Sequence, residues 1–311
     1  GRVSGIYSEE HGILLENNSQ TQKIELKNGG IIKGKIDGIR LTDSASLSGE
    51  MILSGEGSRV EGGRGAGILN RSGKIEGSII IKDGATVTAT SNRAIANSRS
   101  GSITGGITVS GKNTKLEGNI INMGNASIGS DIKIEDGAKV EGGLVNQDNG
   151  VISGSITVDK NSKLDSITNT STSSTGIGGS ITNNSDNKLE ISNGEGATIG
   201  GGITNNGNAD LVISNQGSVG KDKNGNTVTN NGSGSVGIKD WLVSTDKNTG
   251  KLDTVVIGGS GKDNVKVENI TVDQSNVDLE ELNDINNIIS GVNQNNIGNI
   301  GTNGSGEISL S

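Results

Sequence analysis

The chain has no cysteine, no proline and no phenylalanine, and only one tryptophan and one tyrosine among its 311 residues. Without cysteine it can form neither disulfides nor thiolate metal sites. Without proline every backbone N–H can donate, which suits long β-ladders. Aromatic side chains supply much of the buried area of a broad core, so their scarcity argues against one. Isoleucine, valine and leucine instead favour a narrow core of stacked aliphatic side chains.

The charged residues form no basic block. The net charge is −8, and lysine and arginine are scattered among aspartate and glutamate. Binding to nucleic acid needs clustered cations, so nucleic acid is not expected as a partner. No apolar run approaches the roughly 20 residues of a membrane-spanning helix, and no signal peptide is present. Gly1 begins within the repeat pattern and Ser311 ends without a stop signal, so we expect a fragment of a larger protein.

A short phrase of isoleucine, glycine and serine or threonine recurs from about residue 100. Its first isoleucine advances in steps of 25, 24, 25 and 22 residues, at Ile103, Ile128, Ile152, Ile177 and Ile199. A fixed period of this size is typical of a solenoid. The same composition occurs in disordered chains, but disorder gives no reason to keep isoleucine at i, i+4 and i+6 of successive copies. The repeat therefore predicts stacked β-rungs.

Each predicted rung consists of a strand, a turn, a second strand and an asparagine-rich corner. Earlier segments such as 46–53 and 74–81 follow the same phrase. The Asp-Gly and Asn-Gly steps at 83–84, 136–137 and 193–194 are expected to supply positive φ at sharp corners. About 23 residues per rung and ~4.8 Å between rungs predict about 13 rungs and a rod of roughly 60 Å.

Asparagines fall near equivalent places in successive rungs. They are Asn122, Asn146, Asn169, Asn183 and Asn205. Their side chains could bond one rung to the next, as amide ladders do in stacked β-structures. Alternatively, asparagine simply tolerates the left-handed conformation of a corner. Both interpretations stay open, and we favour the corner.

The period degrades after about residue 220. We therefore divide the chain into rungs over 1–220 and C-terminal rungs with a helical cap over 221–311. Leucine and isoleucine at 279, 282, 285 and 289 recur at spacings of three and four, which predicts a helix over 276–290. A bare terminal rung would expose core and unpaired strand edges, so this helix is expected to cap the solenoid.

Three features carry candidate chemistry. Residues 258–266 fit the calcium-binding nonapeptide GGxGxDxUx, but an ion bridges two such turns and only one copy is present, so we interpret it as a chance match. His11, the only histidine, follows Glu9 and Glu10, and we expect a solvated face there. Trp241 could be a binding hot spot, although we expect a core residue anchoring the C-terminal cap.

We assign no catalytic, cofactor-binding or metal-binding residue, and we expect no cofactor. Polysaccharide-cleaving β-helix enzymes need clustered aspartates, a basic residue and aromatic platforms for sugar. Here the aspartates are isolated turn residues, and one histidine leaves little for a serine protease. The sequence therefore predicts a protein that is not an enzyme.

The Ile-x-Gly-x-Ile-x-Val rungs, the lack of cysteine and the degraded C-terminal stretch with a helix resemble the passenger domains of type V autotransporters. Campylobacter autotransporter adhesins are the nearest likeness. The tail from Val277 to Ser311 is similar to the segment before the outer-membrane barrel in Campylobacter and Helicobacter members. The resemblance implies a right-handed parallel β-helix, secretion through the protein's own C-terminal barrel, and display on the bacterial cell surface.

Members of this family serve as adhesins, aggregation factors, toxins or proteases. The leading hypothesis is a non-enzymatic adhesin that binds a host-cell surface receptor or the extracellular matrix. The first alternative is homotypic self-association, in which rods pack through asparagine, threonine and charged ladders and clump bacteria. The second is a structural stalk. A polysaccharide-active enzyme is the least favoured alternative.

Overall fold

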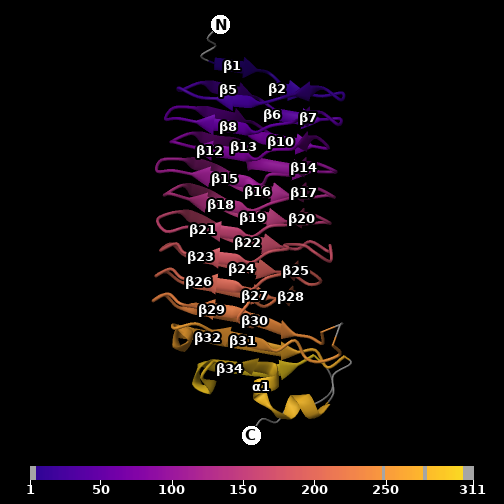
Figure 1. The fold of residues 1–311 in the computed structure, drawn as a ribbon, viewed down its shortest axis with the longest axis vertical. Helices are drawn as coiled ribbons and strands as arrows, with labels where there is room; N and C mark the ends of the chain where they lie inside the picture. The colour runs from indigo at the N-terminus through magenta and orange to yellow at the C-terminus, as the bar shows by residue number, and fades with distance from the viewer. Residues whose placement is uncertain (1–4, 247–248, 276–278, 304–311) are drawn as a thin grey trace.

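The computed structural model describes residues 5–246, 249–275 and 279–303. They form an all-β parallel solenoid of about 11 turns, with the strands of each turn stacked on those of the next (Figure 1). Three parallel sheets run along the rod, here called sheets A, B and C. Very little of the described chain is helical. The predicted all-β parallel β-helix is therefore confirmed.

Sheet A is the largest, with 15 strands. Its main path consists of β1 (Gly5–Ser8), β5 (Ile31–Gly34), β9 (Arg59–Gly62), β13 (Thr86–Ser98), β16 (Lys115–Asn122), β19 (Lys139–Asn146), β22 (Lys163–Asn169), β24 (Leu189–Asn193), β27 (Leu211–Asn215), β30 (Val236–Val243), β32 (Val265–Val272) and β34 (Ile297–Thr302). A side branch consists of β2 (His11–Leu15), β6 (Asp37–Thr42) and β10 (Ile68–Arg71). The early turns thus carry two short strands where later turns carry one.

Sheets B and C complete each turn. Sheet B consists of β3 (Gln20–Thr21), β7 (Ser46–Leu47), β11 (Lys74–Ile75), β14 (Ser102–Ile103), β17 (Ser127–Ile128) and β20 (Val151–Ile152), and bridges through Ile177 extend it to β25 (Thr198–Ile199) and β28 (Ser218–Val219). Sheet C consists of β4 (Ile24–Leu26), β8 (Met51–Ser54), β12 (Ile79–Lys82), β15 (Ile107–Ser110), β18 (Ile132–Glu135), β21 (Ile156–Val158), β23 (Ile181–Asn183), β26 (Ile203–Asn205), β29 (Val228–Asn230), β31 (Val255–Gly258) and β33 (Ile289–Ser290).

Columns of identical aliphatic side chains form the core. The isoleucines that set the sequence period stack in sheet B, each on the next. A second column stacks in sheet C and is at most 1% exposed, comprising Ile79, Ile107, Ile132, Ile156, Ile181 and Ile203. Burying one such side chain stabilises the fold by about 1.5–3 kcal/mol. The periodic isoleucines therefore fix the register of the rungs.

The number of turns is lower than predicted, about 11 instead of 13. The 24-residue step from Lys115 to Lys139 holds only in the middle of the rod. The step from Thr86 to Lys115 is 29 residues, as is that from Val236 to Val265. Longer loops in the outer turns use more chain for each 4.8 Å of rise. The predicted rod was therefore too long.

The buried asparagines form ladders, so the corner interpretation favoured above is wrong. In one ladder each Nδ2 donates to the next Oδ1 over 2.9–3.0 Å, and none of its members has positive φ: Asn70, Asn97, Asn122, Asn146, Asn169, Asn193 and Asn215. A second ladder links Asn183, Asn205 and Asn230 over 3.3 and 3.1 Å. The five asparagines noted in the sequence thus belong to two places, the ends of sheet A strands and of sheet C strands.

The predicted turn glycines are confirmed at two sites of three. Asp83 and Asp136 have φ of 54° each, and the glycines that follow them have φ of 90° and 86°. At the third site Asn193 belongs to the buried ladder, and positive φ occurs instead at Gly196, at 73°. The Asn-Gly pair there lies at the end of a strand, one position before the turn.

The C-terminal cap is much less helical than predicted. Of the helix predicted over 276–290, residues 276–278 lie outside the described residues. Over 279–290 the structure has a 3₁₀ turn, η2 (Leu279–Asn283), one α-helical turn, α1 (Ile285–Ile288), and then strand β33, which pairs with β31. Asp284 interrupts the helix because its backbone is extended and its side chain caps the next turn, accepting from the Asn286 N–H over 2.9 Å. Leu282, Ile288 and Ile289 are still buried against the core, so the segment covers the last turn.

Two further 3₁₀ turns, η1 (Lys262–Asn264) and η3 (Gln294–Asn296), lie between strands of the last turns. Sheets A and C both continue across residue 220, whereas the described part of sheet B ends at Val219. Of the tail from Val277 to Ser311 that carried the family resemblance, residues 277–278 and 304–311 lie outside the described residues.

Candidate interaction surface

Charged side chains form regular columns on the outer face of sheet A. Lys115, Lys139 and Lys163 occupy the same register position in three successive turns. Two residues further on, Glu117 and Glu141 are in register with each other. Successive side chains of a strand point to opposite faces, so the intervening Leu116, Val140 and Leu164 are buried and the charges face solvent. We call this surface the charged face.

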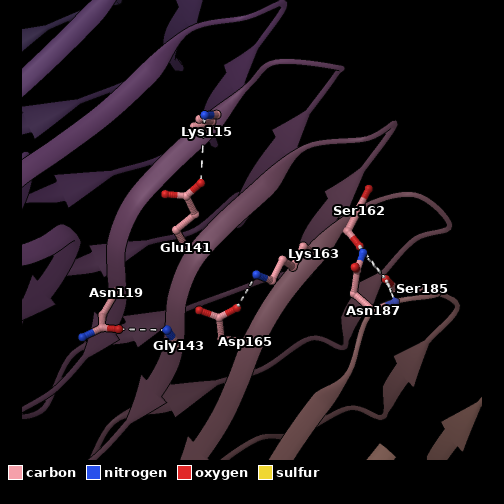
Figure 2. A network of polar contacts seen from close by, with 9 residues as sticks. All are labelled: Lys115, Asn119, Glu141, Gly143, Ser162, Lys163, Asp165, Ser185 and Asn187. Carbon is pink, nitrogen blue, oxygen red and sulfur yellow. Dashed lines mark hydrogen bonds and ion pairs between the residues drawn. The ribbon is translucent and has the colours of Figure 1, made fainter. Parts of the chain in front are cut away.

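Figure 2 shows the ion pairs of the charged face. Lys115 Nζ lies 4.0 Å from Glu141 Oε1, and Lys163 Nζ lies 3.4 Å from Asp165 Oδ1. Nearby, the side chain of Asn119 accepts a 2.8 Å hydrogen bond from the Gly143 N–H. Exposed ion pairs of this kind contribute only about 0–1 kcal/mol. Their charges are therefore available to a ligand at little cost in stability.

The same pairing occurs in the N-terminal turns, where it shifts a pKa. Glu61 contacts Arg59, and its Oε2 lies 3.4 Å from Lys33 Nζ. Partial burial raises the pKa of Glu61. The hydrogen bonds and charges of Arg59 and Lys33 together lower it by more, so the pKa lies below its ordinary value. The carboxylate thus stays ionised at lower pH than an unperturbed glutamate does. Its contribution to stability is lost as pH falls through the lowered pKa.

A groove of about 850 Å³ lies beside the charged face, where the corners between sheets C and A stack. It spans the corners of four successive turns, with Asn184 from the fourth, and its charged walls comprise Lys112, Lys115, Lys139, Lys160, Asp136 and Asp159. Positive φ at Asp136 and Asn161 shapes the corners. Asp136 accepts a 3.0 Å hydrogen bond from Ser110, and Asp159 accepts one of 3.2 Å from Asn184. We call this the lysine groove.

The C-terminal half of sheet C presents a polar face of threonine and asparagine, with the Asp222 carboxylate at its far end, where it accepts a 3.2 Å hydrogen bond from Thr229. Threonines stack in one outer column, Thr157, Thr182, Thr204 and Thr229. A column of asparagines lies two residues after the last three of these threonines in the sequence. The Asn206 amide donates to Asn184 over 2.7 Å, and the Asn231 amide donates to Asn206 over 3.0 Å, so the amides link successive turns. We call this the threonine–asparagine face.

His11 does not lie on a solvated face, contrary to prediction. Its side chain is only 13% exposed, and its Nδ1 lies 3.0 Å from Oδ2 of the fully buried Asp37, without the alignment of a hydrogen bond. Arg40 Nη1 is 3.4 Å from the same oxygen, and the backbone N–H of Ala66 donates to Asp37 Oδ1 over 2.7 Å. The cluster ties three early turns together, which is a structural role.

Trp241 is 4% exposed, and it belongs to the hydrophobic core, as predicted. It pairs with Asn215 on one side and Ile270 on the other. The indole therefore closes the C-terminal end of the long asparagine ladder.

The nonapeptide at 258–266 spans the end of β31, the turn η1 and the start of β32. Within the described residues no three histidine, cysteine, aspartate or glutamate side chains gather as metal ligands. The backbone carbonyl of Asp263 accepts a 3.1 Å hydrogen bond from Asn296 in the next turn.

The sequence reasoning above missed the charged face and the lysine groove, although the sequence carries a signal for them. The tripeptides Lys-Leu-Glu at 115–117, Lys-Val-Glu at 139–141, Lys-Leu-Asp at 163–165 and Lys-Leu-Glu at 188–190 recur in steps of 24, 24 and 25 residues. A basic and an acidic residue flanking a buried one, repeated at the rung period, predicts adjacent columns of opposite charge.

No family model, curated protein or solved structure matches this chain. The described residues contain no helix long and apolar enough to cross a membrane.

Proposed function

We propose that this chain is a non-enzymatic adhesin, the passenger of an autotransporter displayed on the bacterial surface, which binds a receptor or matrix component of host cells. The observation that carries the proposal is the repetition of charged and polar groups in register over successive turns of a rod. Each turn offers the same weak contact, and many such contacts reinforce one another when they are engaged together.

A rigid scaffold favours this mode of binding. The buried isoleucine columns and asparagine ladders hold the turns in register, so the outer groups are already aligned before a ligand arrives. Preorganisation reduces the ordering entropy that binding must overcome. An extended polymer or a matrix fibre lying along the rod would then contact several turns at once.

The test is binding of the purified chain to cultured epithelial cells. We expect saturable binding that unlabelled chain displaces and that weakens with salt, because exposed charges are screened. A parallel β-helix of similar length with a scrambled surface is the control. Binding that does not saturate, or that equals the control while circular dichroism shows an intact β-fold, would refute the adhesin and favour a stalk.

Self-association is the second candidate, and the threonine–asparagine face favours it. Around Thr182 and Thr204 this face is regular and uncharged, so two copies can approach there without like-charge repulsion, whereas Thr229 is buried and donates to the Asp222 carboxylate over 3.2 Å. The outer amides of Asn206 and Asn231 are exposed. They can exchange hydrogen bonds with a second rod.

Under this second candidate, Thr204→Lys should weaken the dimer by about tenfold or more, because a symmetric contact brings two like charges together. Analytical ultracentrifugation over a concentration series measures the change. Thr168→Lys adds the same charge on sheet A and serves as the control. A chain that stays monomeric at all concentrations, or two variants that dimerise alike, would rule out this face.

A further inference from the structure

The lysine groove carries an excess of positive charge in an acidic protein. Four lysines and two aspartates line it, whereas the whole chain has a net charge of −8. Lys112, Lys139 and Lys160 are exposed, and among the residues that the structure describes none of the three has an ion-pair partner within 4.0 Å. Lys115 has only its 4.0 Å contact with Glu141. These ammonium groups are free to bind an anion.

The lysines are also ordered along the rod. Lys115 and Lys139 pair in register in adjacent turns, and Lys112 and Lys160 project from the corners of the first and third turns of the groove. Successive turns are about 4.8 Å apart. A ligand that contacts all four must therefore be extended and must carry negative charges at intervals along its length.

The remaining groups of the groove select among polyanions. Asp136 and Asp159 would repel closely spaced phosphates, but each can accept hydrogen bonds from hydroxyl groups. At the corner tips Asn161 offers an amide that both donates and accepts, and Asn113, whose Nδ2 donates to Glu56 Oε1 over 3.4 Å, offers its amide oxygen. No aromatic side chain lines the groove, so bases have nothing to stack on. Sparse charge with many hydroxyls describes an acidic polysaccharide better than a nucleic acid.

We propose that the lysine groove binds an acidic polysaccharide of the host-cell surface, with Lys112, Lys139 and Lys160 pairing with its sulfate or carboxylate groups. The proposal rests on the adhesin function above and names the class of ligand.

The test measures binding of heparin, a sulphated polysaccharide, to the whole chain by biolayer interferometry. The triple variant K112Q/K139Q/K160Q should lose about tenfold in affinity, which corresponds to about 1.4 kcal/mol shared among three exposed charge contacts. Binding of the unmodified chain should weaken steadily with added salt. All three lysines are exposed, so thermal unfolding should not change.

The matched control is K239Q/K262Q/K266Q. It removes the same charge from exposed lysines of the C-terminal turns, outside the groove. Its affinity for heparin should stay within about twofold of the unmodified chain. Equal losses in both variants would overturn the proposal, because they would reflect net charge alone. Absence of heparin binding would overturn it as well. So would displacement of heparin by neutral dextran, or binding of single-stranded DNA as tight as that of heparin.

The cell assay separates this proposal from the adhesin function. If the chain binds cells and the groove variant binds them equally well, the adhesin stands and the groove proposal fails. If heparin binds through the groove but the chain does not bind cells, the groove stands as an acidic-polysaccharide site, while the adhesin function and the host-cell source of the polysaccharide both fail.

Discussion

Replacing Asn146 by aspartate is expected to destabilise the solenoid by about 3–5 kcal/mol. Asn146 is fully buried in the middle of the long asparagine ladder. Its Nδ2 donates to Asn169 Oδ1 over 3.0 Å and to the Gly150 carbonyl over 3.1 Å. An aspartate of the same shape would set a carboxylate oxygen against these two acceptors. Two hydrogen bonds would be lost, and a charge would be buried without a counter-charge, with only the Asn122 amide left to donate to it.

The matched control is Asn149→Asp, three residues away in the same turn. Asn149 is exposed, with its Nδ2 3.3 Å from Asn125 Oδ1 and its Oδ1 accepting from Thr172 over 2.9 Å. Water can replace these partners, so we expect a loss within about 0.5 kcal/mol. Chemical denaturation and hydrogen exchange over 115–193 measure both variants. Similar losses in the two would show that the buried ladder has no special energetic role.

The fold was predictable because stacking turns impose the same residue at the same place. The isoleucines at 103, 128 and 152 are in register because any other spacing would bury a polar group or expose an apolar one. The asparagine ladder was harder to predict, since asparagine suits both a corner and a stack. The decisive signal is the position of each asparagine in the alternation of buried and exposed residues along its strand. Asn122 follows Leu116 and Ile120 at even spacing, so it falls on the buried side of its strand.

Other features depend on contacts that the local sequence does not contain. Spacings of three and four predicted one helix over 276–290, but Asp284 starts a new turn and Ile289 pairs with Val255 of the preceding turn. The lysine groove needs residues from four turns, and its shape follows from corners that stack only in the fold. The charges themselves are visible in the sequence as a repeated tripeptide, whereas the hollow between them is not.

Asp37 is the other feature that sequence alone could not reveal, because two of its partners, His11 and Ala66, lie 26 and 29 residues away. Its approach to Ala66 depends on Gly65, where an added Cβ would lie 2.1 Å from Asp37 Oδ1. Removing this carboxylate leaves the Ala66 N–H without an acceptor and leaves His11 and Arg40 without the charge that they flank. Breaking a buried ionic contact of this kind costs about 3–5 kcal/mol.

Asp37→Ala should therefore open the first turns without unfolding the rest. Each turn of a solenoid contacts only its neighbours, so the damage stays local. We expect amide exchange over 11–71 to accelerate by about 100- to 1,000-fold or more, since each 1.4 kcal/mol corresponds to tenfold, while exchange over 139–215 stays within about twofold. Asp37→Asn retains an oxygen for the Ala66 N–H and should lose less. Uniform acceleration along the whole chain would mean instead that the turns unfold as one unit, and an unchanged N-terminal region would mean that the cluster does not hold the early turns together.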